Sequence, residues 1–261
     1  MNTHTFDFDV AILGAGSAGY AAARTATAAG LKTAVIEGGP EVGGLCILRG
    51  CMPSKALLYA AEVLHLARNG KTWGLQPGKI GFDFKKVMAR KAAMIEDFAS
   101  YRRKQLASGK FKFIRANARF FDEHTLQLDN GKKLTARHFV IGTGSVVAPP
   151  PLPSLAKVGY LTSDHALSLT RRPKSLIVLG GGAIACELAQ FFARFDVQVT
   201  QIQRSPHVLK EFDDEVGAVV ETVFRREGIN LFTGTKLLEA RRQGKRKVVE
   251  FEQDGKKLRV E

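Results

Sequence analysis

A short apolar run, a glycine-rich turn and an amphipathic segment follow one another at the start of the chain. Residues 10–13 (VAIL) form a continuous apolar run, which predicts a strand buried on both faces. The glycine turn 14–19 comes next, then an alanine-rich helix to residue 29 and a second strand at 33–36, closed by Glu37. Strand, turn, helix and strand within about thirty residues are typical of a βαβ dinucleotide-binding unit.

The middle of the chain changes from helical to strand patterns. Residues 40–55 are predicted to be a loop, and 56–68 and 84–108 to be helices, the second of them very basic. A strand at 111–116 precedes two antiparallel strands, 119–128 and 132–141. The turn Asp129-Asn130-Gly131 between these two strands is a strong hairpin signal. The proline-rich stretch 148–153 predicts a linker, and therefore two domains, 1–150 and 151–261.

The opening pattern recurs beyond this linker. The predicted elements are a strand at 176–179, a glycine turn at 180–185, a helix at 186–195, a strand at 197–202, a helix at 212–227, a strand at 229–232 and a hairpin formed by 248–253 and 256–260. The predicted fold class is therefore α/β, with two tandem Rossmann-like dinucleotide-binding folds, the second of them incomplete.

Composition and charge are those of a globular protein with an anionic partner. Hydrophobic residues make up 45% and the net charge is +14, which favours a nucleotide phosphate, nucleic acid or acidic surface. The basic run 241–247 has no interleaved aromatic residues, so we interpret it as a solvated hairpin flank and expect no nucleic-acid partner. Residues 1–8 lack a basic and an apolar targeting region, and no apolar run is long enough for a membrane span. We therefore expect a cytoplasmic protein without a membrane partner.

The two glycine turns have the chemistry of pyrophosphate sites. Gly14 permits a tight turn, Gly16 lets phosphate oxygens approach the backbone, and Gly19 allows close packing of helix on strand. Glu37 is placed to accept hydrogen bonds from ribose hydroxyls. In the second unit the corresponding position is Gln203, followed by Arg204, which suits the 2′-phosphate of NADPH; NADH is the second choice, and Arg204 as one solvated cation among many is the alternative.

Cys46 and Cys51 are the sharpest chemical feature. Two thiols five residues apart can form a disulfide if their geometry allows, and such a pair in the cytosol is more often catalytic or metal-binding than structural. A metal would need further cysteine or histidine ligands at short spacing, and none lie near, so no metal site is predicted. Lys55 follows Cys51 by four residues and shares its face on any helical continuation. Cys186 is predicted to be a small buried apolar residue.

Taken together, these motifs resemble a known family. The loop GGLCILRGCMPSK, the first turn with Glu37, the segment 141–145 (IGTGS) and the second turn GGGAIACE are similar to class I pyridine nucleotide–disulfide oxidoreductases. These flavoproteins include dihydrolipoamide dehydrogenase, glutathione reductase and mercuric reductase. The resemblance implies that residues 1–150 bind FAD and that residues 151–261 bind NADPH or NADH.

The resemblance also implies a two-electron relay. Hydride would pass from NAD(P)H through FAD to a Cys46–Cys51 disulfide, and on to a small-molecule or protein disulfide, a dithiol or a metal ion. In similar enzymes the first cysteine attacks the substrate and the second lies against the flavin, roles that fall on Cys46 and Cys51. A motif lysine pairs with a glutamate of the second turn's helix; here these are Lys55 and Glu187. The implied cofactor-binding residues are Gly14, Gly16, Ser17, Ala18, Gly19, Glu37, Gly38, Gly43, Gly44, Lys55, Ala118, Thr143, Gly144, Gly180, Gly182, Ala183, Ile184, Gln203 and Arg204.

The sequence departs from the family pattern in several places. Leu45 replaces a threonine, Leu48 and Arg49 replace an asparagine and a small apolar residue, and Ala183 stands where glutathione reductases keep an aromatic over the nicotinamide pocket. The family continues beyond residue 261 with an interface domain and forms homodimers at full length. We therefore expect an N-terminal fragment without a complete relay of its own. The alternative is a noncatalytic FAD- or dinucleotide-binding redox sensor in which the two cysteines toggle.

Overall fold

The computed structural model describes residues 5–76, 78–150 and 152–261. Residues 1–4 of the segment searched for a targeting signal, and Pro151 of the predicted linker, lie outside this range. The chain divides into two compact units: Met1–Pro53 with Ala92–Val146, and Ser54–Lys91 with Val147–Glu261. The sequence predicted an FAD-binding domain at 1–150 and an NAD(P)-binding domain at 151–261. This division is defined by the cofactors that each part binds, and it stays a prediction.

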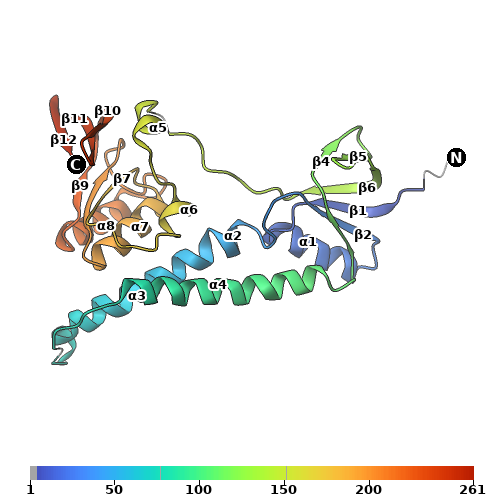
Figure 1. Cartoon of the computed structure of the whole chain (residues 1–261), viewed down its shortest axis with the longest axis horizontal. Coiled ribbons are helices and arrows are strands. Elements are labelled where there is room, and N and C mark those ends of the chain that lie inside the picture. Colours follow the sequence, from blue (N-terminus) through green and yellow to red (C-terminus); the bar gives the residue numbers. More distant parts are fainter. Residues whose placement is uncertain (1–4, 77, 151) are drawn as a thin grey trace. The chain divides into compact units, whose positions relative to one another are not determined.

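A six-stranded sheet with the order β3-β2-β1-β6-β5-β4 forms the centre of the first unit (Figure 1). β1 is parallel to β2 and β6, and β2 is parallel to β3, while β5 is antiparallel to β4 and β6. Helix α1 (Ser17–Ala28) connects β1 to β2 and completes the predicted βαβ unit. The strands are β1 (Phe8–Leu13), β2 (Thr33–Glu37), β3 (Lys112–Arg115), β4 (Ala118–Phe120), β5 (Thr125–Leu128) and β6 (Lys133–Ile141).

Alternate residues of β1 enter two different cores. Val10 and Ile12 pack with Ala23 of α1, whereas Ala11 and Leu13 belong to a second cluster that includes Leu126. Side chains of a strand point alternately to opposite faces, so a continuous apolar run is what a strand covered on both faces requires. The prediction of a doubly buried strand is confirmed.

The redox-motif segment is more helical than predicted, and the loop assignment for residues 40–55 is wrong at its second half. Helix α2 (Leu45–Leu48) contains Cys46, and helix α3 (Cys51–Arg68) begins at Cys51. Pro53 is the third residue of α3, where proline is tolerated because the first-turn N–H groups have no intrahelical acceptor. The proline does not break the segment, because it lies in this first turn.

The predicted single strand 119–128 is also wrong, since it is two strands of a hairpin. β4 and β5 pair antiparallel, and in the turn between them the Asp122 side chain accepts a hydrogen bond from the backbone N–H of His124 at 2.9 Å. The predicted hairpin around Asp129-Asn130-Gly131 is confirmed, with β5 pairing antiparallel to β6 and Gly131 at a φ of +82°.

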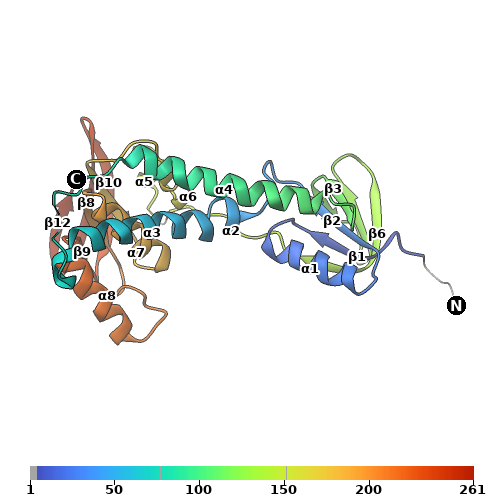
Figure 2. The same cartoon turned by 90° about the horizontal axis from the view of Figure 1, so that it is seen from below.

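The second unit repeats the parallel arrangement on a smaller scale. β7 (Ser175–Leu179), β8 (Gln198–Ile202) and β9 (Asn230–Phe232) form a parallel sheet, with α7 (Ala183–Arg194) and α8 (Asp214–Arg226) as the connections (Figure 2). A separate antiparallel sheet follows, which includes the predicted terminal hairpin. The remaining elements are η1 (Gly70–Trp73), α4 (Phe84–Leu106), α5 (Ser154–Val158), α6 (Ser163–Ala166), β10 (Lys236–Gln243), β11 (Arg246–Gln253) and β12 (Lys256–Val260).

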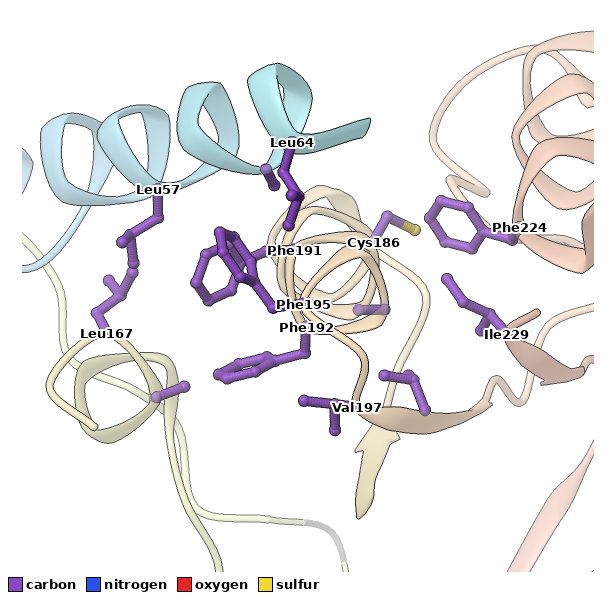
Figure 3. Packing of buried hydrophobic residues seen from close by; sticks show 14 of the residues in the cluster. Leu57, Leu64, Leu167, Cys186, Phe191, Phe192, Phe195, Val197, Phe224 and Ile229 are labelled. Carbon is purple, nitrogen blue, oxygen red and sulfur yellow. The ribbon is translucent and has the colours of Figure 1, made fainter. Parts of the chain in front are cut away.

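Aromatic side chains of α7 fill the core of this unit. Phe191, Phe192 and Phe195 are at most 1% exposed, and Leu57 and Leu64 of α3 point toward them (Figure 3). Burying side chains of this size contributes about 1.5–3 kcal/mol each. This core therefore fixes α3 on α7, and the packing of these two helices positions Lys55, the lysine of the redox motif.

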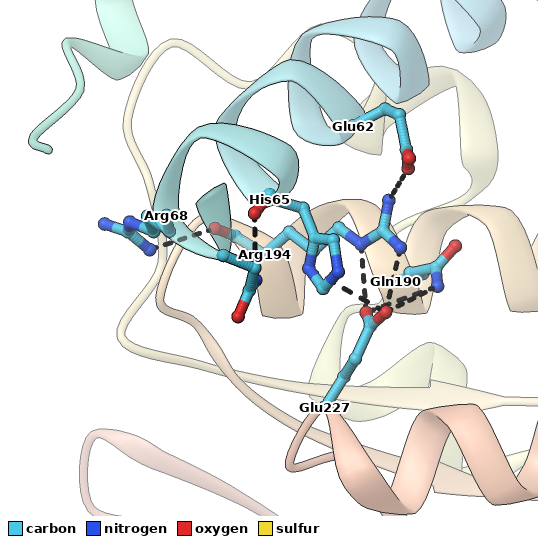
Figure 4. Close-up of polar contacts among 7 residues, drawn as sticks. Glu62, His65, Arg68, Gln190, Arg194 and Glu227 are labelled. Carbon is cyan, nitrogen blue, oxygen red and sulfur yellow. Dashed lines mark hydrogen bonds and ion pairs between the residues drawn. The ribbon is translucent and has the colours of Figure 1, made fainter. Parts of the chain in front are cut away.

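A polar network joins the same two helices to the end of α8. Arg194 of α7 donates to both carboxylate oxygens of Glu227, at 2.8 and 2.9 Å, and also to Glu62 of α3 (Figure 4). Gln190 donates to Glu227 at 3.2 Å, and His65 lies 3.9 Å from it. No sequence pattern pointed to this network, because its members are separated by up to 165 positions in the chain.

The basic run 241–247 lies on the β10–β11 hairpin, whose turn has Gly244 at a φ of +61°. Arg241 forms an ion pair with Glu250 on the neighbouring strand. The run does not flank the predicted hairpin but forms the end of β10, a turn and the start of β11. The missed strand β10 has the polar sequence KLLEARRQ, whose apolar and charged spacing does not alternate with period two.

Candidate functional site

The first glycine turn is closed by backbone contacts that leave no room for side chains. Gly14 has a φ of +99°, and a Cβ there would lie 2.3 Å from the carbonyl oxygen of Gly142. A Cβ on Gly19 would lie 1.8 Å from the carbonyl oxygen of Gly14. These contacts bring the turn, the start of α1 and the end of β6 together, as a dinucleotide-binding turn requires.

The start of α1 suits an anion. Gly16 is the N-cap residue, no side chain in the described residues caps the helix, and its first turn carries no acidic residue. Ser17 and Ala18 are exposed there. The first backbone N–H groups of a helix lack intrahelical acceptors and carry positive potential, so they fit the pyrophosphate of a dinucleotide.

Glu37 is held rigidly at the end of β2. Its Oε2 accepts a hydrogen bond from the backbone N–H of Ala15 at 2.8 Å, and its Oε1 accepts one from Gly39 at 2.7 Å. Each carboxylate oxygen has a second lone pair, so the group can still accept a bond from a ribose hydroxyl. Gly38 beside it has no room for a side chain, because a Cβ would lie 2.0 Å from Oδ1 of Asn117. Ala118, Thr143 and Gly144 follow at the start of β4 and after β6.

The cysteine-bearing loop rests on this turn. Gly44 has a φ of +80°, and a Cβ there would lie 2.4 Å from the Cα of Gly16. Gly43 is also in the positive-φ region, at +140°. Only glycine combines this conformation with so close a backbone approach. The two glycines therefore let the redox motif touch the predicted pyrophosphate turn.

Cys46 and Cys51 lie together at the junction of α2 and α3. Both are thiols, Cys46 half-buried and Cys51 exposed, and their side chains are within hydrogen-bonding distance of each other. The hydrogen bond to Cys51, burial and the negative charge of a Cys51 thiolate raise the pKa of Cys46, while a hydrogen bond from Ser17 lowers it. The two thiols are thus neighbours in the fold, and their pairing as a disulfide stays a prediction.

The structure brings Lys55 and Glu187 together, as predicted. Lys55 Nζ lies 2.5 Å from Glu187 Oε1, although the residues are 132 positions apart. The side chain of Lys55 is 61% exposed and that of Glu187 29% exposed. At these exposures water screens the two charges, so the ion pair contributes little to the free energy of folding.

The second glycine turn also precedes a helix. Gly180 has a φ of +120° and donates to the carbonyl of Ile202 at 2.9 Å, while Gly182 caps α7 with open space around it. Ala183 and Ile184 are exposed in the first turn of α7. A Cβ on Gly181 would lie 2.9 Å from the side chain of Gln203. The turn therefore fits a second dinucleotide.

Gln203 and Arg204 differ in burial and in hydrogen bonding. Gln203 is 6% exposed; its Oε1 accepts a hydrogen bond from the backbone N–H of Arg204 at 3.1 Å, and its Nε2 donates to the carbonyl of His207 at 3.4 Å. Arg204 is exposed. Cys186 is 7% exposed and burial raises its pKa, so the prediction of a buried apolar cysteine is confirmed.

Two further findings limit the kinds of site. Among the described residues, no helix combines the length and apolarity that a membrane span requires. Within that same part of the chain, no three histidine, cysteine, aspartate or glutamate side chains gather in a way that would hold a metal ion.

Two Rossmann-like folds, each with a glycine turn that fits a dinucleotide, and a cysteine pair against the first turn define a class of dinucleotide-dependent redox proteins. The comparisons identify the family: residues 8–261 match the pyridine nucleotide-disulphide oxidoreductase family, and the chain belongs to it. This family uses FAD and NAD(P)H.

Curated relatives and solved structures agree with this assignment. The chain is 37% identical to a mercuric reductase of Bacillus cereus over 98% of its own length and 40% of the relative's. It is 35% identical to a dihydrolipoyl dehydrogenase of Bacillus subtilis, covering 89% and 51% of the two chains. The Cu(II) complex of the HOCl-induced flavoprotein disulfide reductase RclA from Escherichia coli matches with a TM-score of 0.79 and 26% identity, covering 96% and 54%. The chain thus spans about half the length of the relatives that it matches.

Proposed function

We propose that this chain is the cofactor-binding and redox-active portion of an FAD-dependent NAD(P)H oxidoreductase that acts on a disulfide, a dithiol or a metal ion. One observation carries the proposal: Cys46 and Cys51 lie in contact on a loop whose Gly44 packs against Gly16, and Ser17 of the same turn bonds to Cys46. A thiol pair held against a pyrophosphate-binding turn is the arrangement that a flavin-linked disulfide needs. The family assignment supports the same function.

The first unit would hold FAD through the start of α1, Glu37 and the residues of the cysteine loop. When bound, FAD would accept a hydride from a nicotinamide and would deliver two electrons to a disulfide. The chain would contribute the orientation: the N–H groups at 17–19 would face the pyrophosphate, and Glu37 is held by its two backbone donors. The second unit would hold the nicotinamide dinucleotide at the turn 180–182 and the start of α7.

The two cysteines would carry the sulfur chemistry. Cys46, once deprotonated, attacks one sulfur of a substrate disulfide; the substrate S–S bond breaks, one substrate thiolate leaves, and a mixed disulfide forms. Cys51 then attacks the Cys46 sulfur and releases the second substrate thiolate. The substrate has gained two electrons and the Cys46–Cys51 pair has lost them. Lys55, paired with Glu187, would position the cofactor end of this site.

The nicotinamide preference follows from the end of β8. The Gln203 side chain is occupied by protein hydrogen bonds and carries no charge to repel a phosphate, while Arg204 is exposed beside it. A guanidinium suits a 2′-phosphate. We therefore propose NADPH as the preferred donor, with NADH second.

The substrate class and assembly rest on the relatives. Their printed names are mercuric reductase, dihydrolipoyl dehydrogenase and flavoprotein disulfide reductase, so we propose a metal ion, a dithiol or a disulfide as the substrate. A homodimer of the full-length enzyme and a cytoplasmic location complete the proposal.

The test is an anaerobic titration of the purified chain with FAD. We expect a bound flavin absorption band, bleaching by NADPH at lower concentration than by NADH, and a gain of two titratable thiols. C46S and C51S should bind flavin but gain no thiols, whereas C186S, the matched control, should behave as the parent. A chain whose thiols change oxidation state without flavin binding or reduction would instead be a redox sensor, and the proposal would be wrong.

A further inference from the structure

Gln201 of β8 is an unusual residue in the core of the second unit. Its side chain is fully buried, at 0% exposed, on the same face of the strand as Val199. Val199 belongs to the apolar cluster that contains Ala189 and Phe192 of α7, so an apolar residue at position 201 would continue that face. Burying an amide in such surroundings is unfavourable unless its polar atoms are paired.

The two polar atoms of this amide differ in their partners. Gln201 Nε2 donates to the carbonyl oxygen of Gly180, in the second glycine turn, at 3.0 Å, and lies 3.7 Å from the sulfur of Cys186. Its Oε1 is buried, and no donor among the described residues lies within hydrogen-bonding distance of it. An unpaired buried acceptor is unfavourable, so folding alone would favour an apolar side chain at this position. The bond to Gly180 therefore points to a role at the glycine turn.

This bond sets the direction of the first peptide group of the turn. A peptide group is planar and trans, so a Gly180 oxygen that faces the buried amide directs the N–H of Gly181 the opposite way. The Gly181 oxygen is held in the same manner, by the backbone N–H of Leu209 at 2.7 Å. Both carbonyl oxygens thus face protein donors, and the N–H groups that follow them are directed away from those donors, as an anionic ligand requires.

The turn needs such an anchor because it consists of three consecutive glycines, 180–182. Gly180 has a φ of +120°, and glycine loses more conformational freedom on ordering than any other residue. A turn that is ordered before its ligand arrives avoids this entropy cost in the binding step. Gln201 lies on β8, which pairs with β7 directly before the turn, so its amide holds the turn from the buried side.

We propose that Gln201 is a positioning residue for the nicotinamide dinucleotide, because its amide holds the second glycine turn in the conformation that binds the pyrophosphate. This inference deepens the proposed function and rests on its assignment of the turn 180–182 to NAD(P)H. No motif in the sequence singled out Gln201, since it lies 21 positions from the glycine that it holds.

The test compares ligand binding with stability in the purified chain. Q201M keeps the length of the side chain but removes its donor and its unpaired acceptor. We expect Q201M to weaken NADPH binding in calorimetric titration by about fivefold, the order that one hydrogen bond contributes. Binding of adenosine 2′-monophosphate, which has no pyrophosphate, should be unchanged, and the urea midpoint followed by Trp73 fluorescence should not fall. Q198M makes the same substitution at an exposed position of the same strand and is the matched control.

Several results would overturn the inference. Equal NADPH affinities for Q201M and Q198M would show that the amide does not position the turn. Equal losses for NADPH and adenosine 2′-monophosphate would show an effect that is not specific to the pyrophosphate. A urea midpoint that falls together with the affinity would assign Gln201 a structural role alone; if Q201M does not fold, Q201L replaces it. A parent chain that binds no NADPH would contradict the proposed second cofactor site and this inference with it, whereas intact binding by the parent confines a failure to the role of Gln201.

Discussion

Replacing Glu227 by glutamine should destabilise the second unit. The Glu227 side chain is 8% exposed and accepts two hydrogen bonds from Arg194, whose own side chain is 13% exposed. Removing one partner of a fully buried ion pair costs about 3–5 kcal/mol. Arg194 keeps Glu62, which is 45% exposed, and glutamine retains one acceptor oxygen. We therefore expect E227Q to lower the free energy of unfolding by about 2 kcal/mol.

Urea denaturation measures this loss. Trp73, the one tryptophan in the chain, belongs to the second unit, so its fluorescence reports that unit separately from the first. With an m value of about 2 kcal/mol/M, the midpoint should fall by about 1 M. E239Q removes an exposed carboxylate that pairs with Arg241 and should shift the midpoint by less than about 0.2 M. Equal midpoints for E227Q and E239Q would refute the reasoning.

The same pair predicts a pH dependence. Burial by itself disfavours the charged form of Glu227, but hydrogen bonds and attraction from Arg194 outweigh it and hold the pKa of this carboxyl below its ordinary 4.5. A lowered folded-state pKa gives stability that is complete above the unfolded value and disappears as pH falls through the folded value. The difference between parent and E227Q should therefore be full at pH 7 and shrink below about pH 4.5. A difference that grows on acidification would contradict the assignment.

Three further experiments test the site. G44A should weaken FAD binding by about tenfold in a fluorescence titration, because its Cβ would clash with Gly16; G74A, at a similar φ in open space, should not, and equal losses would contradict this. E187Q should change the free energy of unfolding by under about 0.5 kcal/mol, since its lysine partner is exposed, yet slow flavin reduction in stopped flow; a normal rate would remove the pair from the mechanism. Native reduced chain should show two fast thiols with Ellman's reagent, with Cys186 reacting only after denaturation; three fast thiols would show that it is accessible.

Local pattern was enough to predict the βαβ units and the family. The apolar run at 10–13, the glycines at 14, 16 and 19 and the motif around Cys46 and Cys51 each act within a few residues, where backbone conformation and side-chain type decide the outcome. The prediction of secondary structure failed where a local hydrogen bond or the start of a helix overrides the pattern of apolar and polar residues. Asp122 ends a strand that the pattern would continue, and Cys51 starts a helix in a segment that reads as a loop.

Contacts between distant residues were decided by tertiary structure. The approach of Gly44 to Gly16, the hydrogen bond from Gln201 to Gly180 and the network around Glu227 join segments that no short-range pattern relates. Lys55 and Glu187 could be paired in advance only through the family resemblance. A sequence records which side chains are available and their local conformations, but burial and charge pairing depend on which surfaces pack together, and folding of the whole chain determines that.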